Sequence, residues 1–210
     1  MVLLNAKPYC VGGHTESWMQ GSIKFALYSF HMNTNEMSAS DLSKVVTRIT
    51  AEFAALGVMP TPGQTVADIG SGPALVAFAL IRHVADATCI SIRPTNELDD
   101  ARALAAQVGV QDRVTFHELD IAALDFEADS VDVALLGERI HGLDDEQLCA
   151  LLTNLRRAVR PGGVLYITGV SSPAVSDVTL RSRLTESGFD DVSQASGGSF
   201  VLRRFALSAA

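Results

Sequence analysis

Short runs of consecutive apolar residues alternate with longer segments whose apolar residues lie three or four positions apart, from about residue 65 to residue 188. The first pattern is typical of a buried strand, and the second of an amphipathic helix with one face against a core. We predict strands running into Asp68 and at 88–92, 113–118, 130–136 and 164–170, and helices at 40–56, 74–84, 96–108, 144–159 and 177–186. Segments 189–195 and 199–207, joined by Gly197-Gly198, predict a closing antiparallel pair.

The alternation of strand and helix at the spacing of βαβ units predicts an α/β fold. We expect a Rossmann-like, doubly wound, mostly parallel seven-stranded sheet, with helices on both faces and a C-terminal antiparallel strand pair. Arg160-Pro161-Gly162-Gly163 predicts a tight turn into the fifth strand. Ligands of such sheets bind at the carboxyl ends of the strands, near the point where the strand order reverses.

Residues 1–59 precede the first strand and predict an N-terminal helical cap, and residues 60–210 form the expected ligand-binding domain. Within the cap, residues 17–30 hold a dense apolar and aromatic cluster. This cluster either packs over the domain or covers the mouth of the ligand site, and the sequence favours neither.

The composition narrows the class of protein. Hydrophobic residues make up 48% and charged residues 19% of 210 residues, which is typical of a globular protein. The net charge of −8 and the lack of a Lys/Arg cluster argue against nucleic acid as a partner. No apolar stretch reaches the length of a membrane span, and the first four residues lack the features of a signal peptide. Cys10, Cys89 and Cys149 show no metal spacing, so we expect a reducing, cytoplasmic location.

A glycine turn follows the first strand in the segment Val66-Ala-Asp-Ile-Gly-Ser-Gly-Pro-Ala74. Glycines allow a tight turn and a close approach by a ligand, and the following helix directs its free N–H groups at that ligand. A dinucleotide site would need a third glycine where Leu75 stands, and a P-loop would need a Gly-Lys-Ser/Thr ending. The pattern Asp68-x-Gly70-x-Gly72-x-Ala74 therefore indicates another nucleotide class.

This pattern resembles the first motif of the class I S-adenosylmethionine (SAM) methyltransferases, an acid followed by G-x-G-x-G, with Ala74 in place of the last glycine. Three further segments resemble later motifs of that family: D-R-V-T-F-H-E-L-D-I, D-S-V-D-V-A-L-L-G-E and A-V-R-P-G-G-V-L-Y-I. The resemblance extends over about residues 60 to 207. It implies the methyltransferase fold and SAM as the cofactor.

The resemblance also implies a set of cofactor-binding residues: Asp68, Gly70, Ser71, Gly72, Ser91, Ile92, Asp120, Ile121 and Gly137. Asp120 would accept the adenine amino hydrogen, with Ile121 against the ring. Ser91 stands where most members have an acid that binds the ribose diol. Two alternatives stay open: Asp68 only fixes the turn by accepting backbone N–H groups, and Ser91 is an unimportant strand-end residue.

Ser91 and the segment G-E-R-I-H-G-L-D-D resemble a group of natural-product and sterol methyltransferases with the motif E-S-L-H-H-M-P-D. That match implies Glu138 and His141 as catalytic residues, because the corresponding histidine removes the substrate proton in some members. The alternatives are that His141 is a surface or capping residue and that Glu138 pairs with an arginine.

The implied chemistry is a direct displacement that moves a methyl group from the sulfonium to a small-molecule acceptor, for which a hydroxyl of a secondary metabolite is expected. Histidine suits proton removal from a hydroxyl because its pKa lies near the working pH. No Asp/Asp/Asn metal cluster is evident, so we expect no metal. A second subunit could cover the substrate, and a homodimer is therefore considered.

Two alternatives remain open at this point. A protein of this fold can catalyse a cyclisation or rearrangement instead of methyl transfer, with or without bound SAM, or it can act only as a binding partner. Ala74, Ser91 and the short segment 171–176, where the family often places a substrate lid, motivate the first alternative.

Overall fold

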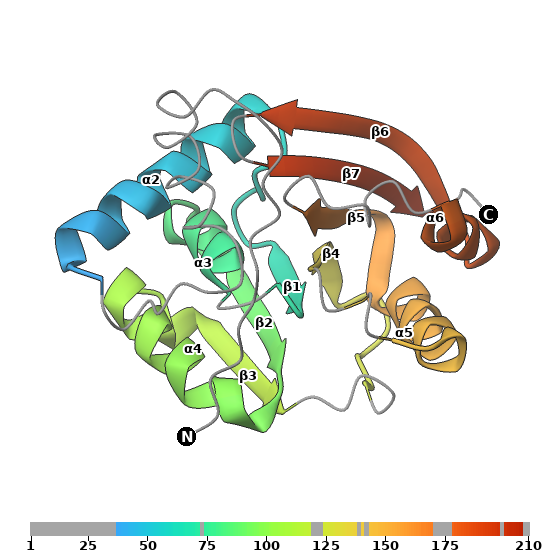
Figure 1. Cartoon of the computed structure of the whole chain (residues 1–210), viewed down its shortest axis with the longest axis horizontal. Helices are drawn as coiled ribbons and strands as arrows, with labels where there is room; N and C mark the ends of the chain where they lie inside the picture. The colour runs from blue at the N-terminus through green and yellow to red at the C-terminus, as the bar shows by residue number, and fades with distance from the viewer. Residues whose placement is uncertain are drawn as a thin grey trace, which may run out of the picture.

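The computed structural model describes residues 37–71, 74–118, 124–137, 140, 143–169, 178–197 and 200–207. Its strands are β1 (Thr65–Ile69), β2 (Thr88–Arg93), β3 (Val114–Glu118), β4 (Val131–Leu136), β5 (Val159–Gly169), β6 (Phe189–Gly197) and β7 (Phe200–Leu207). The helices are α2 (Ala39–Ala55), α3 (Leu75–Arg82), α4 (Thr95–Val108), α5 (Asp145–Ala158) and α6 (Val178–Glu186), and a 3₁₀ turn, η2, spans Gln111–Arg113 (Figure 1).

The strands form one seven-stranded sheet in the order β3-β2-β1-β4-β5-β7-β6. The first five strands pair in parallel, and β7 runs antiparallel to both β5 and β6. This confirms the predicted fold class and the C-terminal antiparallel pair. The chain continues outward from β1 through β2 to β3 and then returns to β4 on the other side of β1, so the strand order reverses between β1 and β4.

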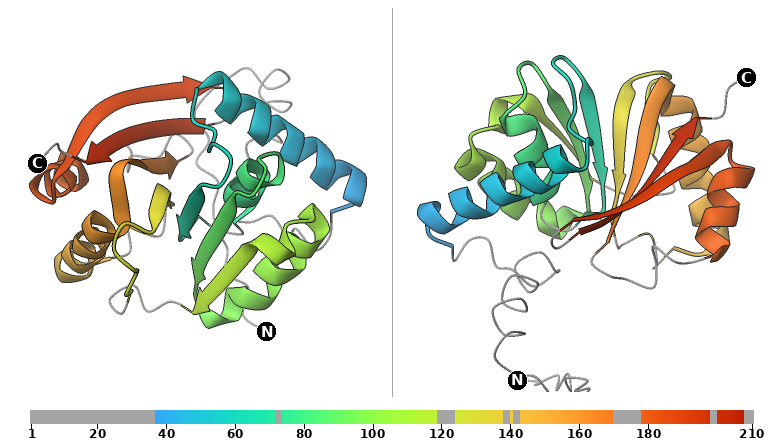
Figure 2. Two further views of the ribbon diagram at one scale, coloured as in Figure 1. Left: turned by 180° about the vertical axis from the view of Figure 1, so that it is seen from behind. Right: turned by 90° about the horizontal axis from the view of Figure 1, so that it is seen from above.

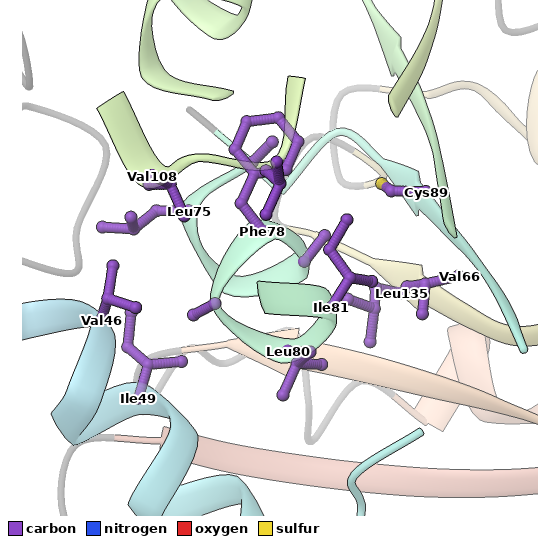
Figure 3. Packing of buried hydrophobic residues seen from close by; sticks show 14 of the residues in the cluster. Val46, Ile49, Val66, Leu75, Phe78, Leu80, Ile81, Cys89, Val108 and Leu135 are labelled. Carbon is purple, nitrogen blue, oxygen red and sulfur yellow. The ribbon is translucent and has the colours of Figure 1, made fainter. Parts of the chain in front are cut away.

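Helices cover both faces of the sheet, with α2, α3 and α4 on one side and α5 and α6 on the other (Figure 2). Helix α3 lies at the centre of the first layer, where Phe78, Leu80 and Ile81 are fully buried. Figure 3 shows Ile81 beside Leu135 and Val66 of the strands, and Phe78 on the side of Leu75 and Val108. Full burial of one such side chain contributes roughly 1.5–3 kcal/mol, so this layer holds the glycine turn against a rigid support.

Helix α2 shows how the local sequence sets its own boundaries. The Ser38 side chain accepts a hydrogen bond from the Asp41 backbone N–H, which caps the first turn. Gly57 adopts φ 69 immediately after the helix, a left-handed conformation that suits glycine. The buried face of α2 joins the α3 core, and Thr50 Oγ1 donates to the Ala79 carbonyl at 3.1 Å. The boundary between residues 59 and 60 stays a prediction, and residues 1–36 lie outside the described part.

The prediction of a turn before the fifth strand at Arg160-Pro161-Gly162-Gly163 is wrong, because these residues lie inside β5. The pairing of β4 with β5 shifts register between Val131 and Val133, and Gly162 adopts φ 81. Between the pairs Val131–Val159 and Val133–Val164, β5 advances five residues while β4 advances two, so the irregularity takes up three extra residues while the strand continues, and the turn-forming residues do not end it.

The amino ends of the central strands are joined by a buried aspartate. Asp132 Oδ2 accepts a hydrogen bond from the Thr65 backbone N–H at 2.8 Å, and Asp132 Oδ1 lies 3.2 Å from Arg160 Nη1. Both carboxylate oxygens of Asp132 therefore have partners. None of the helices in the described ranges is long and apolar enough to cross a membrane.

Candidate cofactor site

The glycine turn leaves β1 at the carboxyl edge of the sheet and packs tightly against the residue that follows β4. Gly70 adopts φ 66, which a side chain would strain, and Gly137 donates its backbone N–H to the Ile69 carbonyl at 3.0 Å. A Cβ at Gly137 would lie 2.3 Å from both the Gly70 carbonyl oxygen and Ser71 Cα. Two of the predicted cofactor residues, Gly70 and Gly137, are thus brought together; a side chain at Gly70 would strain the backbone, and one at Gly137 would have no room.

Ala74 enters α3 in a conformation that explains why the family pattern has glycine there. Its φ of 60 and ψ of 8 are left-handed, and no side-chain hydrogen bond caps the helix. The first N–H groups of a helix have no partner within it, and the helix dipole places partial positive charge at this end. The turn therefore presents hydrogen-bond donors at the edge where a ligand is expected.

Arg93, the last residue of β2, is a site residue that the sequence analysis missed. Its side chain is fully buried, Nε donates to Ser91 Oγ at 2.9 Å, and Nη2 forms an ion pair with Asp68 Oδ2. The available signal was an arginine two positions after Ser91 in an otherwise apolar strand, since alternate strand residues share a face. A buried arginine is rare unless it is paired, so this position is chemically marked.

Asp68 lies opposite Ser91 in the pairing of β1 with β2, and it is fully buried. Burial raises the pKa of its carboxyl, while Arg93 and the Ser71 hydroxyl act in the opposite direction. Although Ser71 is close enough to affect that pKa, its Oγ lacks hydrogen-bond geometry to any partner among the described residues, as does Asp68 Oδ1. Asp68 is thus paired with Arg93 through one oxygen, while its other oxygen has no hydrogen-bond partner among the described residues, and its role towards a ligand stays a prediction.

The two residues predicted at the end of β2 face opposite sides of the sheet. Ser91 is buried towards α3 and α4, and its hydroxyl already accepts the bond from Arg93. Ile92 is buried in the core on the α5 side, where it also lines a cavity of about 680 Å³. The cavity is lined by Ile90, Ile92, Thr115, His117, Glu118, Leu124, Asp125, Phe126, Glu127 and Ser130.

Five predicted site residues lie outside the described residues: Gly72, Asp120, Ile121, Glu138 and His141. Their roles stay predictions. Within the described ranges, no three His, Cys, Asp or Glu side chains form a group that could hold a metal ion.

Comparison with known proteins adds a family to this geometry. The family model described as a methyltransferase domain matches residues 66–163, from the start of β1 to the bulge of β5. A curated relative, methyltransferase GfsG of Streptomyces halstedii, is 30% identical over 134 residues, which cover 63% of this chain and 42% of that protein. The chain thus spans less than half of this relative.

Two solved structures share the fold at low sequence identity. An O-methyltransferase family 2 protein from Planctomyces limnophilus, in complex with apigenin, matches with a TM-score of 0.61 at 20% identity over 80% of this chain and 60% of that chain. A SAM-dependent methyltransferase from Aquifex aeolicus matches with a TM-score of 0.62 at 17% identity over 83% of this chain and all of that chain, at 100%.

The order of the strands and the glycine turn at the switch point define a Rossmann-like methyltransferase fold. Residues 66–163 match the methyltransferase domain model, and the fold and the curated relative support a class I SAM-dependent methyltransferase domain here. SAM is the cofactor of this family. The described residues fit it, because Asp68, Ser71 and Arg93 each leave a buried polar atom without a hydrogen bond beside a turn that admits no side chain at Gly137.

Proposed function

We propose that this protein binds SAM at the glycine turn and transfers its methyl group to a small-molecule acceptor, a hydroxyl of a secondary metabolite. The observation that carries the proposal is the unsatisfied polar cluster beside that turn, inside the residues that match the methyltransferase domain. Buried polar atoms in native proteins almost always have partners, so a cluster of three without them indicates a place for a polar ligand.

The proposed cofactor contacts follow the carboxyl edge of the sheet. Asp68, Gly70, Ser71 and Gly72 form the turn around the cofactor, and Gly137 closes it from β4. Ser91 lies on the ribose side. Apolar contact for the adenine ring comes from Ile92 and Ile121, and Asp120 accepts a hydrogen bond from the adenine amino group.

Bound SAM supplies an activated methyl group, so the protein chiefly aligns donor and acceptor. A hydroxyl acceptor must lose its proton as it attacks, and we propose that His141, which follows β4 in the sequence, accepts this proton, with Glu138 as the second catalytic residue. Positioned acid–base catalysis of this kind contributes about 10²–10⁴-fold in rate. We place the acceptor under the N-terminal apolar and aromatic cluster of residues 17–30, or under a second subunit.

The choice of a small hydroxylated acceptor is supported by one shared-fold structure, which is an O-methyltransferase family protein in complex with apigenin. It is also supported by the resemblance around Ser91 and His141 to natural-product methyltransferases.

The test combines binding with turnover on the full chain. Calorimetry measures the affinity for SAM and S-adenosylhomocysteine (SAH), and transfer of labelled methyl from SAM to a panel of phenolic and aliphatic alcohols measures activity. We expect binding of both, and methyl transfer that falls about 10²–10⁴-fold in His141→Ala with unchanged SAH affinity.

The outcomes separate the alternatives. Failure to bind either cofactor form would reject the cofactor assignment. Binding without transfer to any acceptor would favour a non-methylating reaction, such as a cyclisation or rearrangement, in the same pocket. Loss of SAH binding in His141→Ala would place that residue in the cofactor site instead of beside the acceptor.

A further inference from the structure

Among the described residues, three buried polar atoms without hydrogen-bond partners lie at the carboxyl ends of β1 and β2 and in the turn that follows β1: Asp68 Oδ1, Ser71 Oγ and Arg93 Nη1. Arg93 Nη1 lies 3.9 Å from Glu97 Oε2 in the first turn of α4. This distance is too long for a hydrogen bond. A buried donor or acceptor that stays unpaired costs about 1–3 kcal/mol, and more when it is charged.

These atoms belong to a cation and an anion, the Arg93 guanidinium and the Asp68 carboxylate, and each can form a further hydrogen bond. The guanidinium has five N–H donors in a fixed fork, and only Nε and Nη2 have partners among the described residues. Asp68 uses Oδ2 alone, while Oδ1 stays available as an acceptor. A ligand that satisfies both must carry an anionic acceptor and a cationic donor close together, as the α-carboxylate and α-ammonium of an amino acid do.

We infer that Arg93 is the residue that recognises the amino-acid end of the cofactor, with its Nη1 donating to the α-carboxylate while Asp68 Oδ1 accepts from the α-ammonium. This inference rests on the proposed cofactor. Ser71 Oγ supplies a further hydrogen bond to the same carboxylate. Arg93 thereby carries out a binding task that the glycine motif alone does not perform.

The uncapped start of α3 strengthens the assignment. Helix N-termini favour negative charge, and no side chain among the described residues caps α3 at Ala74 by a hydrogen bond. A carboxylate bound between Arg93 and this helix end is stabilised from two sides. The neutral hydroxyls of ribose satisfy the same atoms less well, because hydrogen bonds between ionised groups are roughly twice as strong as neutral ones.

The experiment compares two ligands that differ only in the amino-acid part. SAH carries the α-carboxylate and α-ammonium, whereas 5′-deoxy-5′-methylthioadenosine keeps the adenosine and the sulfur but lacks both charged groups. Calorimetry on the full chain measures both affinities in the wild type, Arg93→Met and Arg93→Lys. Arg102→Met is the matched control, because it replaces arginine by methionine at a position away from the turn. Arg102 lies on α4, and 54% of its side chain is exposed.

We expect Arg93→Met to bind SAH about 10- to 100-fold more weakly, as for loss of a charge-assisted hydrogen bond, with unchanged affinity for the methylthioadenosine. Arg93→Lys keeps the buried charge and protects the fold, but an ammonium cannot bind Asp68 and the ligand in the forked geometry of a guanidinium. It should therefore lose SAH affinity by a smaller factor and also keep the affinity for the methylthioadenosine. Arg102→Met should bind both like the wild type.

The ratio of the two affinities decides the result, because a general disturbance of the pocket weakens both ligands together. Equal losses for both ligands in Arg93→Lys would overturn the inference and place Arg93 on the adenosine side or in a purely structural role. An unchanged SAH affinity in both Arg93 variants would overturn it as well. If the wild type binds neither ligand, the proposed cofactor itself fails, which is a distinguishable outcome.

Discussion

Two aspartate–arginine pairs lie at opposite ends of the parallel strands, and their carboxylates differ in how completely they are satisfied. At the amino ends, Asp132 uses one oxygen for the Thr65 N–H and the other for Arg160, whose side chain is 43% exposed. At the carboxyl ends, Asp68 and Arg93 are both fully buried, yet one carboxylate oxygen and one guanidinium nitrogen have no hydrogen bond.

The two pairs therefore differ at their carboxylates, although the Arg160 guanidinium also has a buried Nε without a hydrogen bond among the described residues. A carboxylate with two partners contributes to the fold and offers nothing to a ligand, whereas a buried pair with spare donors and acceptors remains costly until something binds. The fold carries that cost at the edge where sheets of this type bind ligands. The same two residue types therefore form a fully satisfied carboxylate at one end of the strands, and at the other end a partly satisfied one, which is the pair that we propose for ligand binding.

The largest expected effect comes from removing each arginine in turn. Arg93→Met leaves the Asp68 carboxylate buried without its cation, and breaking a buried pair in this way typically costs about 3–5 kcal/mol. Arg160→Met breaks a pair that water partly screens, so we expect a loss of about 1 kcal/mol or less. Urea unfolding of both variants at neutral pH measures the comparison, and similar losses would show that burial does not distinguish the pairs.

The second comparison uses a glycine near each pair. In Gly137→Ala the new methyl group meets the backbone of Gly70 and Ser71, and in Gly163→Ala it would lie 2.7 Å from Val159 Cγ1 and 2.9 Å from the Arg160 carbonyl oxygen. Overpacking costs typically about 1–3 kcal/mol, so both variants should unfold more easily. Only Gly137→Ala should also weaken SAH binding, because it displaces the glycine turn. Equal SAH affinities in the two variants would contradict a special role for the carboxyl edge.

A pH titration tests the charge state of Asp68 in its pair with Arg93. Because burial raises the pKa of Asp68 above its ordinary 3.8, the folded state holds this proton more tightly than the unfolded state. The contribution of Asp68 to stability is therefore greatest below the unfolded pKa and is lost as the pH rises through the folded value. The stability of the wild type relative to Asp68→Asn should fall as the pH rises from about 4. A rise would mean that Arg93 outweighs burial.

The smallest expected effect is at Ala74, which leaves both pairs intact. Glycine relieves a left-handed conformation that costs other residues about 1–2 kcal/mol. Two terms act in the opposite direction and destabilise the folded state. The loss of a buried methyl group costs about 0.8 kcal/mol, and the greater conformational entropy of glycine in the unfolded chain costs about 0.4–1 kcal/mol. We expect Ala74→Gly to change the unfolding free energy by less than about 1 kcal/mol. A much larger change would mean that this alanine has a packing role beyond its backbone conformation.

Much of the fold followed from periodicity, because buried strands and one-sided helices leave different spacings in the sequence. Helix α4, predicted at 96–108, spans Thr95–Val108. The glycine turn followed from its spacing. The bulge inside β5 did not, because Pro161 and Gly162 carry the same local signal in a turn and in an irregular strand.

The candidate site was harder to predict, since its most informative residue has no motif around it. Arg93 becomes meaningful only when β1 and β2 align Asp68 with Ser91, and that register depends on the folded sheet. Local sequence shows that a charged residue ends the strand, but not that its guanidinium turns back into the protein.

The hydrogen bond from Thr65 to Asp132 joins residues 67 positions apart in the chain. Contacts between distant segments form slowly, because a long loop must close before they contribute. During synthesis β1 emerges well before β4, so the side of β1 that later pairs with β4 offers unpaired backbone groups to other chains. The part of the sheet that bears the glycine turn therefore stays prone to association until the chain has grown past residue 136.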